Sequence, residues 1–166
     1  MLKEHPFLVT TTFQGDGKTI KYDITKPNRS EAVGKAFKIN ADGKGELVGD
    51  GDEIDGKVIS VDDDHKFTGA YMFGGLNLPL GENATVARGD KIVGALGASS
   101  AKGYVKSATE PAALADIEAA DFDTAAEELV VHNAARAQIT NLVNALKGKG
   151  SVHNSDTTHA LVALGA

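Results

Sequence analysis

Short stretches of alternating hydrophobic and polar residues dominate the first two thirds of the chain. Residues 7–13 are rich in β-branched and aromatic residues, and a second alternating stretch at residues 20–24 follows a Gly- and Asp-containing turn. This pattern predicts a β-hairpin. Because Pro27 then interrupts the alternation, we expect residues 1–26 to form an N-terminal hairpin or arm that leaves the main body.

The alternation resumes at Val33 and continues in short segments, each bounded by Gly, Asp or Pro. This spacing is typical of a small β-barrel or sandwich, which we expect over residues 27–108. The predicted strands of this core are residues 33–39, 46–48, 57–61, 66–73, 91–96 and 104–108. Three aromatic residues of the segment 66–73 have the same parity, so this strand is expected to cross the core.

Beyond residue 108 the sequence becomes rich in Ala, Leu and acidic residues, and a helical insertion is expected over residues 109–148. A capping box at Thr124 to Glu127 predicts a helix from about residue 125 to residue 146. One face of this helix is an apolar stripe made of Val131, Ala135, Ile139, Leu142 and Leu146. The helix should therefore lie against a surface, and the stripe has two interpretations: packing on the chain's own barrel, or an interface between subunits of a trimer.

The end of the chain, residues 149–166, contains an uncharged β-type segment at residues 159–164. We expect it to be a last strand that returns to the core. The fold class predicted for the whole chain is mainly β, a small barrel or sandwich with an inserted helical segment, and α+β overall.

Composition narrows the range of functions. The formal net charge is −6, and no run of Lys or Arg supplies a basic face, so direct binding to nucleic acid is not expected. The first 12 residues lack the apolar region of a signal peptide, and no window approaches the ~18 apolar residues of a membrane span. With no Cys, no disulfide contributes to stability.

Candidate metal and catalytic motifs each fail on spacing. The acidic run from Asp42 to Asp64 has no calcium-binding loop, because position 5 counted from Asp50 is Ile54. His153, Asp156 and His159 could form a small hydrolase site, but the chain has neither an HExxH motif nor a Gly-x-Ser-x-Gly elbow. We therefore expect no catalytic residue, no metal and no cofactor, and we interpret the acidic residues as solvated turns.

The tripeptide Arg88-Gly89-Asp90 matches an adhesion motif, and two glycosylation sequons begin at Asn28 and Asn83. Glycosylation requires a secretory route for which the sequence has no signal. We predict that the tripeptide closes a tight turn before a strand.

Several short segments follow one another in an order that resembles a known family. They are Val33-Gly34-Lys35-Ala36, Ile54-Asp55-Gly56-Lys57-Val58, Gly74-Gly75 with Leu78-Pro79, Gly89-Asp90 and Gly103-Tyr104-Val105. In this order the chain resembles the head decoration, or capsid cement, proteins of tailed bacteriophages over about residues 32–108.

The resemblance implies a structural virion protein without enzymatic activity. Such a protein forms a homotrimer, binds the major capsid protein at three-fold and quasi-three-fold sites of the expanded capsid, and stabilises the shell against internal DNA pressure. Its location would be the outer capsid surface, and the host cytoplasm during assembly. The helical insertion and the N-terminal segment are departures from the simplest members.

On this hypothesis the capsid-binding element is the N-terminal segment with Phe7, Leu8, Val9 and Phe13, and the possible trimer interface is Val131, Ile139, Leu142 and Leu146. The segment would become ordered on binding or add a strand to a coat-protein edge. Deletion of residues 1–13 is expected to leave the fold and the trimer intact. The alternative function is that of an exposed virion adhesin that binds a host-surface glycan or receptor.

Overall fold

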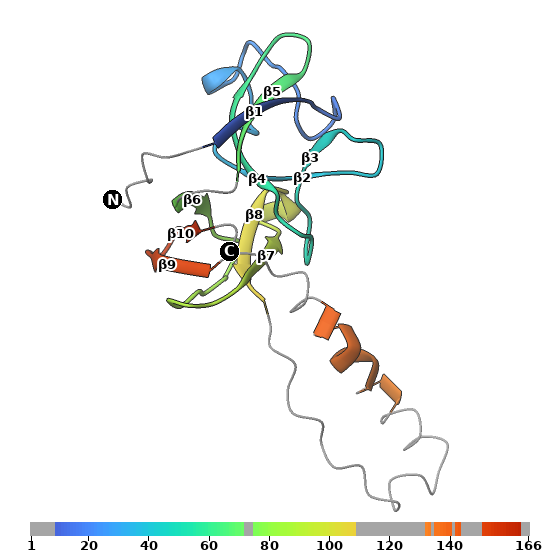
Figure 1. The fold of residues 1–166 in the computed structure, drawn as a ribbon, viewed down its shortest axis with the longest axis vertical. Helices are drawn as coiled ribbons and strands as arrows, with labels where there is room; N and C mark the ends of the chain where they lie inside the picture. The colour runs from blue at the N-terminus through green and yellow to red at the C-terminus, as the bar shows by residue number, and fades with distance from the viewer. Residues whose placement is uncertain are drawn as a thin grey trace, which may run out of the picture.

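The computed structural model describes residues 9–71, 75–108, 132–133, 135–140, 142–143 and 151–163. The fold is mainly β, with three antiparallel sheets and one short helical segment (Figure 1). The predicted fold class is confirmed. Figure 1 shows the largest sheet above the two smaller ones.

The largest sheet contains five strands in the order β1-β5-β4-β2-β3. The strands are β1 (Val9–Gln14), β2 (Ala36–Ile39), β3 (Gly45–Leu47), β4 (Gly56–Val61) and β5 (Lys66–Tyr71). The sheet curls, because an isolated parallel bridge joins Gly15, just after β1, to Gly45 in β3. The two edge strands therefore meet at one end of the sheet.

The two smaller sheets are formed by the later strands. They are β6 (Gly75–Pro79), β7 (Ile92–Ala95), β8 (Tyr104–Ser107), β9 (Ser151–Ser155) and β10 (His159–Ala163). One sheet has the order β6-β10-β9, and the other pairs β7 with β8. A bridge between Leu80 and Val105 connects them. Two short 3-10 turns, η1 (Pro27–Arg29) and η2 (Ala98–Ser100), lie in the connections between strands.

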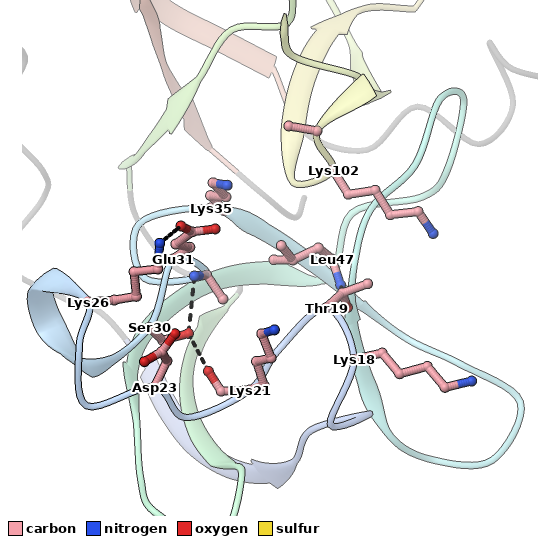
Figure 2. A pocket seen from close by; sticks show the side chains of 12 residues that line it. Lys18, Thr19, Lys21, Asp23, Lys26, Ser30, Glu31, Lys35, Leu47 and Lys102 are labelled. Atoms are coloured by element: carbon pink, nitrogen blue, oxygen red, sulfur yellow. Dashed lines mark hydrogen bonds and ion pairs between the residues drawn. The ribbon is translucent and has the colours of Figure 1, made fainter. Parts of the chain in front are cut away.

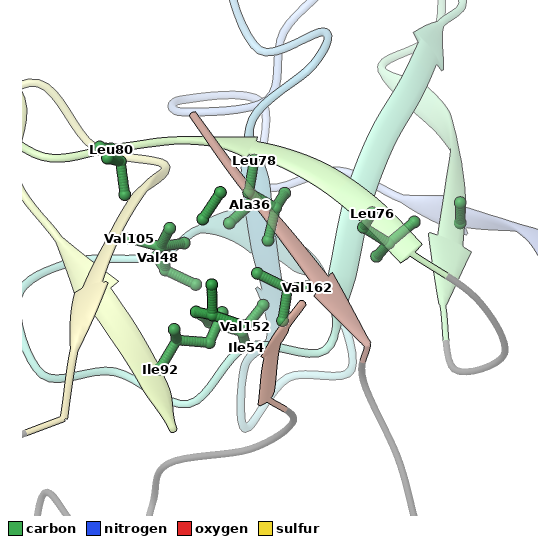
Figure 3. Packing of buried hydrophobic residues seen from close by; sticks show 12 residues of the cluster. Ala36, Val48, Ile54, Leu76, Leu78, Leu80, Ile92, Val105, Val152 and Val162 are labelled. Carbon is green, nitrogen blue, oxygen red and sulfur yellow. The ribbon is translucent and has the colours of Figure 1, made fainter. Parts of the chain in front are cut away.

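Two hydrophobic clusters hold these sheets together. The larger one joins the small sheets to the inner end of the large sheet, and Figure 3 shows it with Ile54, Val105 and Val162 at its centre. The second cluster fills the curl of the large sheet and contains Phe37 and Phe67, both completely buried. Although only 5% of the residues are aromatic, these two large rings fill much of the small second cluster.

Most strands expected in the β core are present, but the predicted N-terminal hairpin is wrong. β1 pairs with β5 over its whole length and not with residues 20–24. The side chain of Ile20 is completely buried in the second cluster, and Ser30 Oγ donates a hydrogen bond to the Lys21 carbonyl at 2.7 Å. Residues 16–32 are thus a folded loop of the main body, since core burial and tertiary hydrogen bonds replace the local strand pairing.

Strands β6 and β9 were not expected from the sequence. β6 contains the alternating Leu76 and Leu78, both buried, and it ends in Pro79. β10, at the expected last strand, lies between β6 and β9 and so returns the end of the chain to the small sheets.

The described residues between 132 and 143 are helical, within the predicted helix. In Figure 1 they lie well below the sheets, with no strand beside them. Of the two interpretations of the apolar stripe, packing on the chain's own barrel does not fit Ile139 and Leu142, whose exposed fractions are 63% and 47%.

Candidate functional site

Two of the four predicted capsid-binding residues, Val9 and Phe13, belong to the described part of the chain, and their surroundings differ. Phe7 and Leu8 lie outside the described residues. Val9 is 43% exposed and stands at the start of β1. Phe13 is half-buried, and its ring lies 5.4 Å from that of Phe67 and 5.6 Å from that of Phe37, centroid to centroid. The structure therefore assigns Phe13 to the core and leaves Val9 as the exposed member.

β1 is an edge strand, since β5 is its one neighbour in the order of the described sheet. Four of its first five side chains are exposed, and three of these are threonines, Thr10, Thr11 and Thr12. An exposed edge strand of six residues is a template on which another chain can add a strand. β1 is uncharged and contains none of the Lys, Pro or Glu residues that usually block such an edge.

The predicted trimer residues define a second exposed surface. Val131 and Leu146 lie outside the described residues, whereas Ile139 and Leu142 are exposed. Val143, which is not a member of the predicted stripe, is also exposed, at 42%. Since residues three and four positions apart share one face of a helix, Ile139, Leu142 and Val143 form one apolar patch. We call these three residues the helix patch.

The acidic residues of the Asp42 to Asp64 region take part in structural contacts. The carboxylate of Asp52 accepts hydrogen bonds from the Gly49 N–H at 2.7 Å and from Lys38 Nζ at 2.9 Å. Burial raises the pKa of Asp52, but these two hydrogen bonds and the positive charges of Lys38 and Lys102 together outweigh it and hold the pKa below its ordinary value. Lys38 also pairs with Glu46 at 3.2 Å, so its pKa is raised although burial acts to lower it.

Two further acidic groups have similar roles. Asp55 Oδ2 accepts a hydrogen bond from the Ile39 N–H at 2.7 Å, and Asp50 pairs with Lys106 at 2.7 Å. Within the described part of the chain, no group of three or more His, Asp or Glu side chains is arranged to hold a metal ion.

The remaining short motifs are turns. Asp90 Oδ2 accepts a hydrogen bond from the Ala87 N–H at 2.8 Å, and Gly89 has a φ of +94°. The predicted turn at Arg88-Gly89-Asp90 is confirmed. Asp156 Oδ1 accepts hydrogen bonds from the backbone N–H groups of Thr158 and His159, both at 2.8 Å. By accepting these two backbone hydrogen bonds, the Asp156 carboxylate stabilises the turn that precedes β10.

A hydrolase site at this turn gains no support from the described atoms. His159 Nδ1 lies 2.8 Å from Thr158 Oγ1, which itself contacts Asp156. The side chain of His153 lies outside the described part. Turn stabilisation accounts for the arrangement of Asp156 and His159.

Comparison of the chain with protein-family models, with curated proteins and with solved structures finds no match in any of the three. Among the helical residues that the structure describes, no helix is long and apolar enough to cross a membrane. The two exposed surfaces, the β1 edge and the helix patch, are therefore the candidate functional sites of the described residues.

Proposed function

We propose that this chain is a structural virion protein that binds the outside of an expanded phage capsid as a homotrimer and stabilises the shell. The observation that carries the proposal is the exposed edge of β1, next to the apolar residues Phe7 and Leu8 in the sequence. The proposal also draws on the order of short segments in the β core, which resembles that of decoration proteins.

The β1 edge suits attachment to a lattice of identical coat subunits. Strand addition uses main-chain hydrogen bonds, which supply affinity without large side-chain anchors. This property matches a chain with no Trp and an aromatic fraction of 5%. In the proposed complex, the outer edge of β1 pairs with a strand of the major capsid protein, and Val9 contacts its surface.

The helix patch supplies the second contact that such a protein requires. A subunit that both self-associates and docks needs two separate surfaces, and Figure 1 shows β1 and the helical residues on opposite sides of the molecule. Three copies joined through the helix patch would present three β1 edges together. Trivalent attachment then strengthens binding by a factor of about 10² or more over one weak contact.

The proposal is tested by co-sedimentation with expanded shells that lack this protein. We expect saturation near one copy per coat subunit and an increase in the temperature at which the shells break. Absence of binding would exclude the cement function and leave the adhesin alternative, for which a glycan array is the corresponding assay.

The structure changes the choice of variants for this test. Deletion of residues 1–13 is unsuitable, because it removes most of β1 and the Phe13 ring from the core, so we no longer expect the truncated chain to keep its fold. Deletion of residues 1–8 leaves β1 in place. The substitution Val9→Lys adds a charge to the exposed start of the edge strand.

Ile24→Lys is the matched control, because Ile24 is 70% exposed and lies outside all strands. We expect Val9→Lys to weaken shell binding and Ile24→Lys to leave it unchanged. Equal binding by both variants would exclude β1 as the docking strand.

A further inference from the structure

A pocket of about 400 Å³ lies where residues 18–35 meet β3 and the loop before β8 (Figure 2). Its charged lining is dominated by five lysines: Lys18, Lys21, Lys26, Lys35 and Lys102. These are five of the 17 basic residues in a chain whose net charge is −6. Two carboxylates, Asp23 and Glu31, also line the pocket, so three positive charges remain in excess.

Carboxylates of the chain balance only part of this positive charge. Lys21 helps to lower the pKa of Asp23 and Glu31. Lys102 helps to lower the pKa of Asp52. Lys26 pairs with Glu31 at 2.6 Å. Lys18, Lys21 and Lys102 form no ion pair with any carboxylate that the structure describes. The Asp23 carboxylate accepts hydrogen bonds from the N–H and hydroxyl of Thr25. The pocket therefore keeps an excess of positive charge, which favours an external anion.

The backbone of the pocket is held in place independently of any ligand. Asp16 accepts hydrogen bonds from the N–H groups of Lys18, Thr19 and Ile20 at 2.9 to 3.1 Å. Thr19 Oγ1 accepts a hydrogen bond from the Leu47 N–H at 2.9 Å, which fixes the loop to β3. A ligand therefore has to order lysine side chains but not the chain that supports them.

On the far side of the pocket, Lys35 extends over the ring of Tyr104, with its Nζ atom 5.3 Å from the ring centroid. Lys102 comes from the loop that precedes β8. Its neighbour Gly103 has a φ of +92°, and its N–H donates a hydrogen bond to the Val48 carbonyl at 2.8 Å. The pocket is thus built from two parts of the chain that are distant in sequence.

We propose that this pocket binds a small, multiply charged oxyanion, a compound with two or more phosphate or sulfate groups. Lysine ammonium groups act as compact point charges, which suit the high charge density of such groups. Arg29 is absent from the lining, and no other arginine lies there, so the described pocket lacks the planar fork that favours a single carboxylate. A volume of about 400 Å³ matches a small molecule.

Binding would also link two regions of the fold. An anion held between Lys21 and Lys102 connects the 16–32 loop to the loop before β8, across the edge of β3. Because the anion binds the folded chain alone, it raises the midpoint of thermal unfolding as its concentration increases above Kd. This site is independent of the proposed shell binding, and the free protein in solution is sufficient to test it.

Calorimetric titration with inorganic tripolyphosphate tests the site, with a fully sulfated disaccharide as the second probe. We expect binding that weakens as salt is added, because the contacts are charge-assisted. The double variant Lys21→Gln/Lys102→Gln should weaken binding about tenfold or more. Both of these side chains are exposed, so the variant is expected to fold.

The control variant is Lys44→Gln/Lys91→Gln, which removes the same charge at two exposed lysines outside the pocket. It should bind each probe as tightly as the unmodified chain. A preference for tripolyphosphate identifies a phosphate compound as the ligand class, and a preference for the disaccharide identifies a sulfated sugar. Failure of both probes to bind at millimolar concentration, or equal weakening in both variants, overturns the proposal.

Discussion

The ring of Phe67 meets the ring of Phe37 edge to face, with 4.9 Å between centroids and an interplanar angle of 75°. This pair is the centre of the cluster that fills the curled five-stranded sheet. Glycines make room for it: a Cβ atom at Gly45 would lie 2.2 Å from Phe67 Cε1, and one at Gly69 would lie 2.6 Å from Phe37 Cζ. The aromatic core and the curl of the sheet therefore depend on these two positions.

We predict that Gly45→Ala destabilises the fold by roughly 2–3 kcal/mol, because the added methyl group must displace a completely buried ring. Urea unfolding followed by circular dichroism measures the change. Gly43→Ala is the control, since nothing lies within 4 Å of its Cβ position and its φ of +73° adds a strain of about 1 kcal/mol. A smaller loss for Gly45→Ala than for Gly43→Ala would contradict this account of the core.

Alternation in the sequence predicted the strands of the β core but not all of their partners. The segments that form β4, β5, β7 and β8 could be predicted because each is a short β-type stretch between glycine or acidic turns. The pairing of β1 with β5 could not be predicted, since β5 lies about 50 residues away and the stacking of Phe13 on Phe67 selects it. Tertiary burial of Ile20 outweighed the hairpin pattern.

The candidate sites, too, could be predicted from the sequence only where the residues involved are close together in the chain. The sequence contains no basic run, yet the fold gathers five lysines around one pocket, because the 16–32 loop turns towards Lys102. No spacing rule links Lys21 to Lys102. By contrast, Ile139 and Leu142 could be found from helical periodicity, although their exposure could not.

Asp16 holds the loop that carries three of the five lysines of the pocket. We predict that Asp16→Ala destabilises the protein by roughly 1–3 kcal/mol, because it leaves the N–H groups of Lys18, Thr19 and Ile20 without their acceptor. Thermal unfolding measures the loss, and amide hydrogen exchange should increase at residues 18–20. Unchanged exchange there would show that the carboxylate does not hold the loop.

Stability should decrease in acid. Burial raises the pKa of Asp16, but hydrogen bonds from Ile20, Thr19 and Lys18 outweigh it, so the pKa lies below 3.8; the pKa of Asp52 is also lowered. Because the folded values are lower than the unfolded ones, this contribution is complete above about pH 5 and is lost as the pH falls through about 4 and below. Urea midpoints measured from pH 7 to pH 3 test this.

The double variant Asp16→Asn/Asp52→Asn isolates these two carboxylates. It should be less stable than the unmodified chain at pH 7, and the difference should shrink towards pH 3, where protonation of the carboxylates in the unmodified chain begins to remove their contribution. A constant difference over this range would show that neither pKa is lowered by folding.

The helix patch leads to a prediction about assembly. Ile139→Glu places a charge at the most exposed member of the patch, so a complex that buries this face should dissociate. The single chain should lose little stability, because Ile139 is 63% exposed.

Ala137→Glu is the matched control, because it introduces the same side chain at an exposed position about 160° away around the helix. Sedimentation velocity should show trimers for Ala137→Glu and monomers for Ile139→Glu. Trimers of both variants would assign self-association to another surface and make the β1 edge, with its exposed Val9, the first alternative to examine.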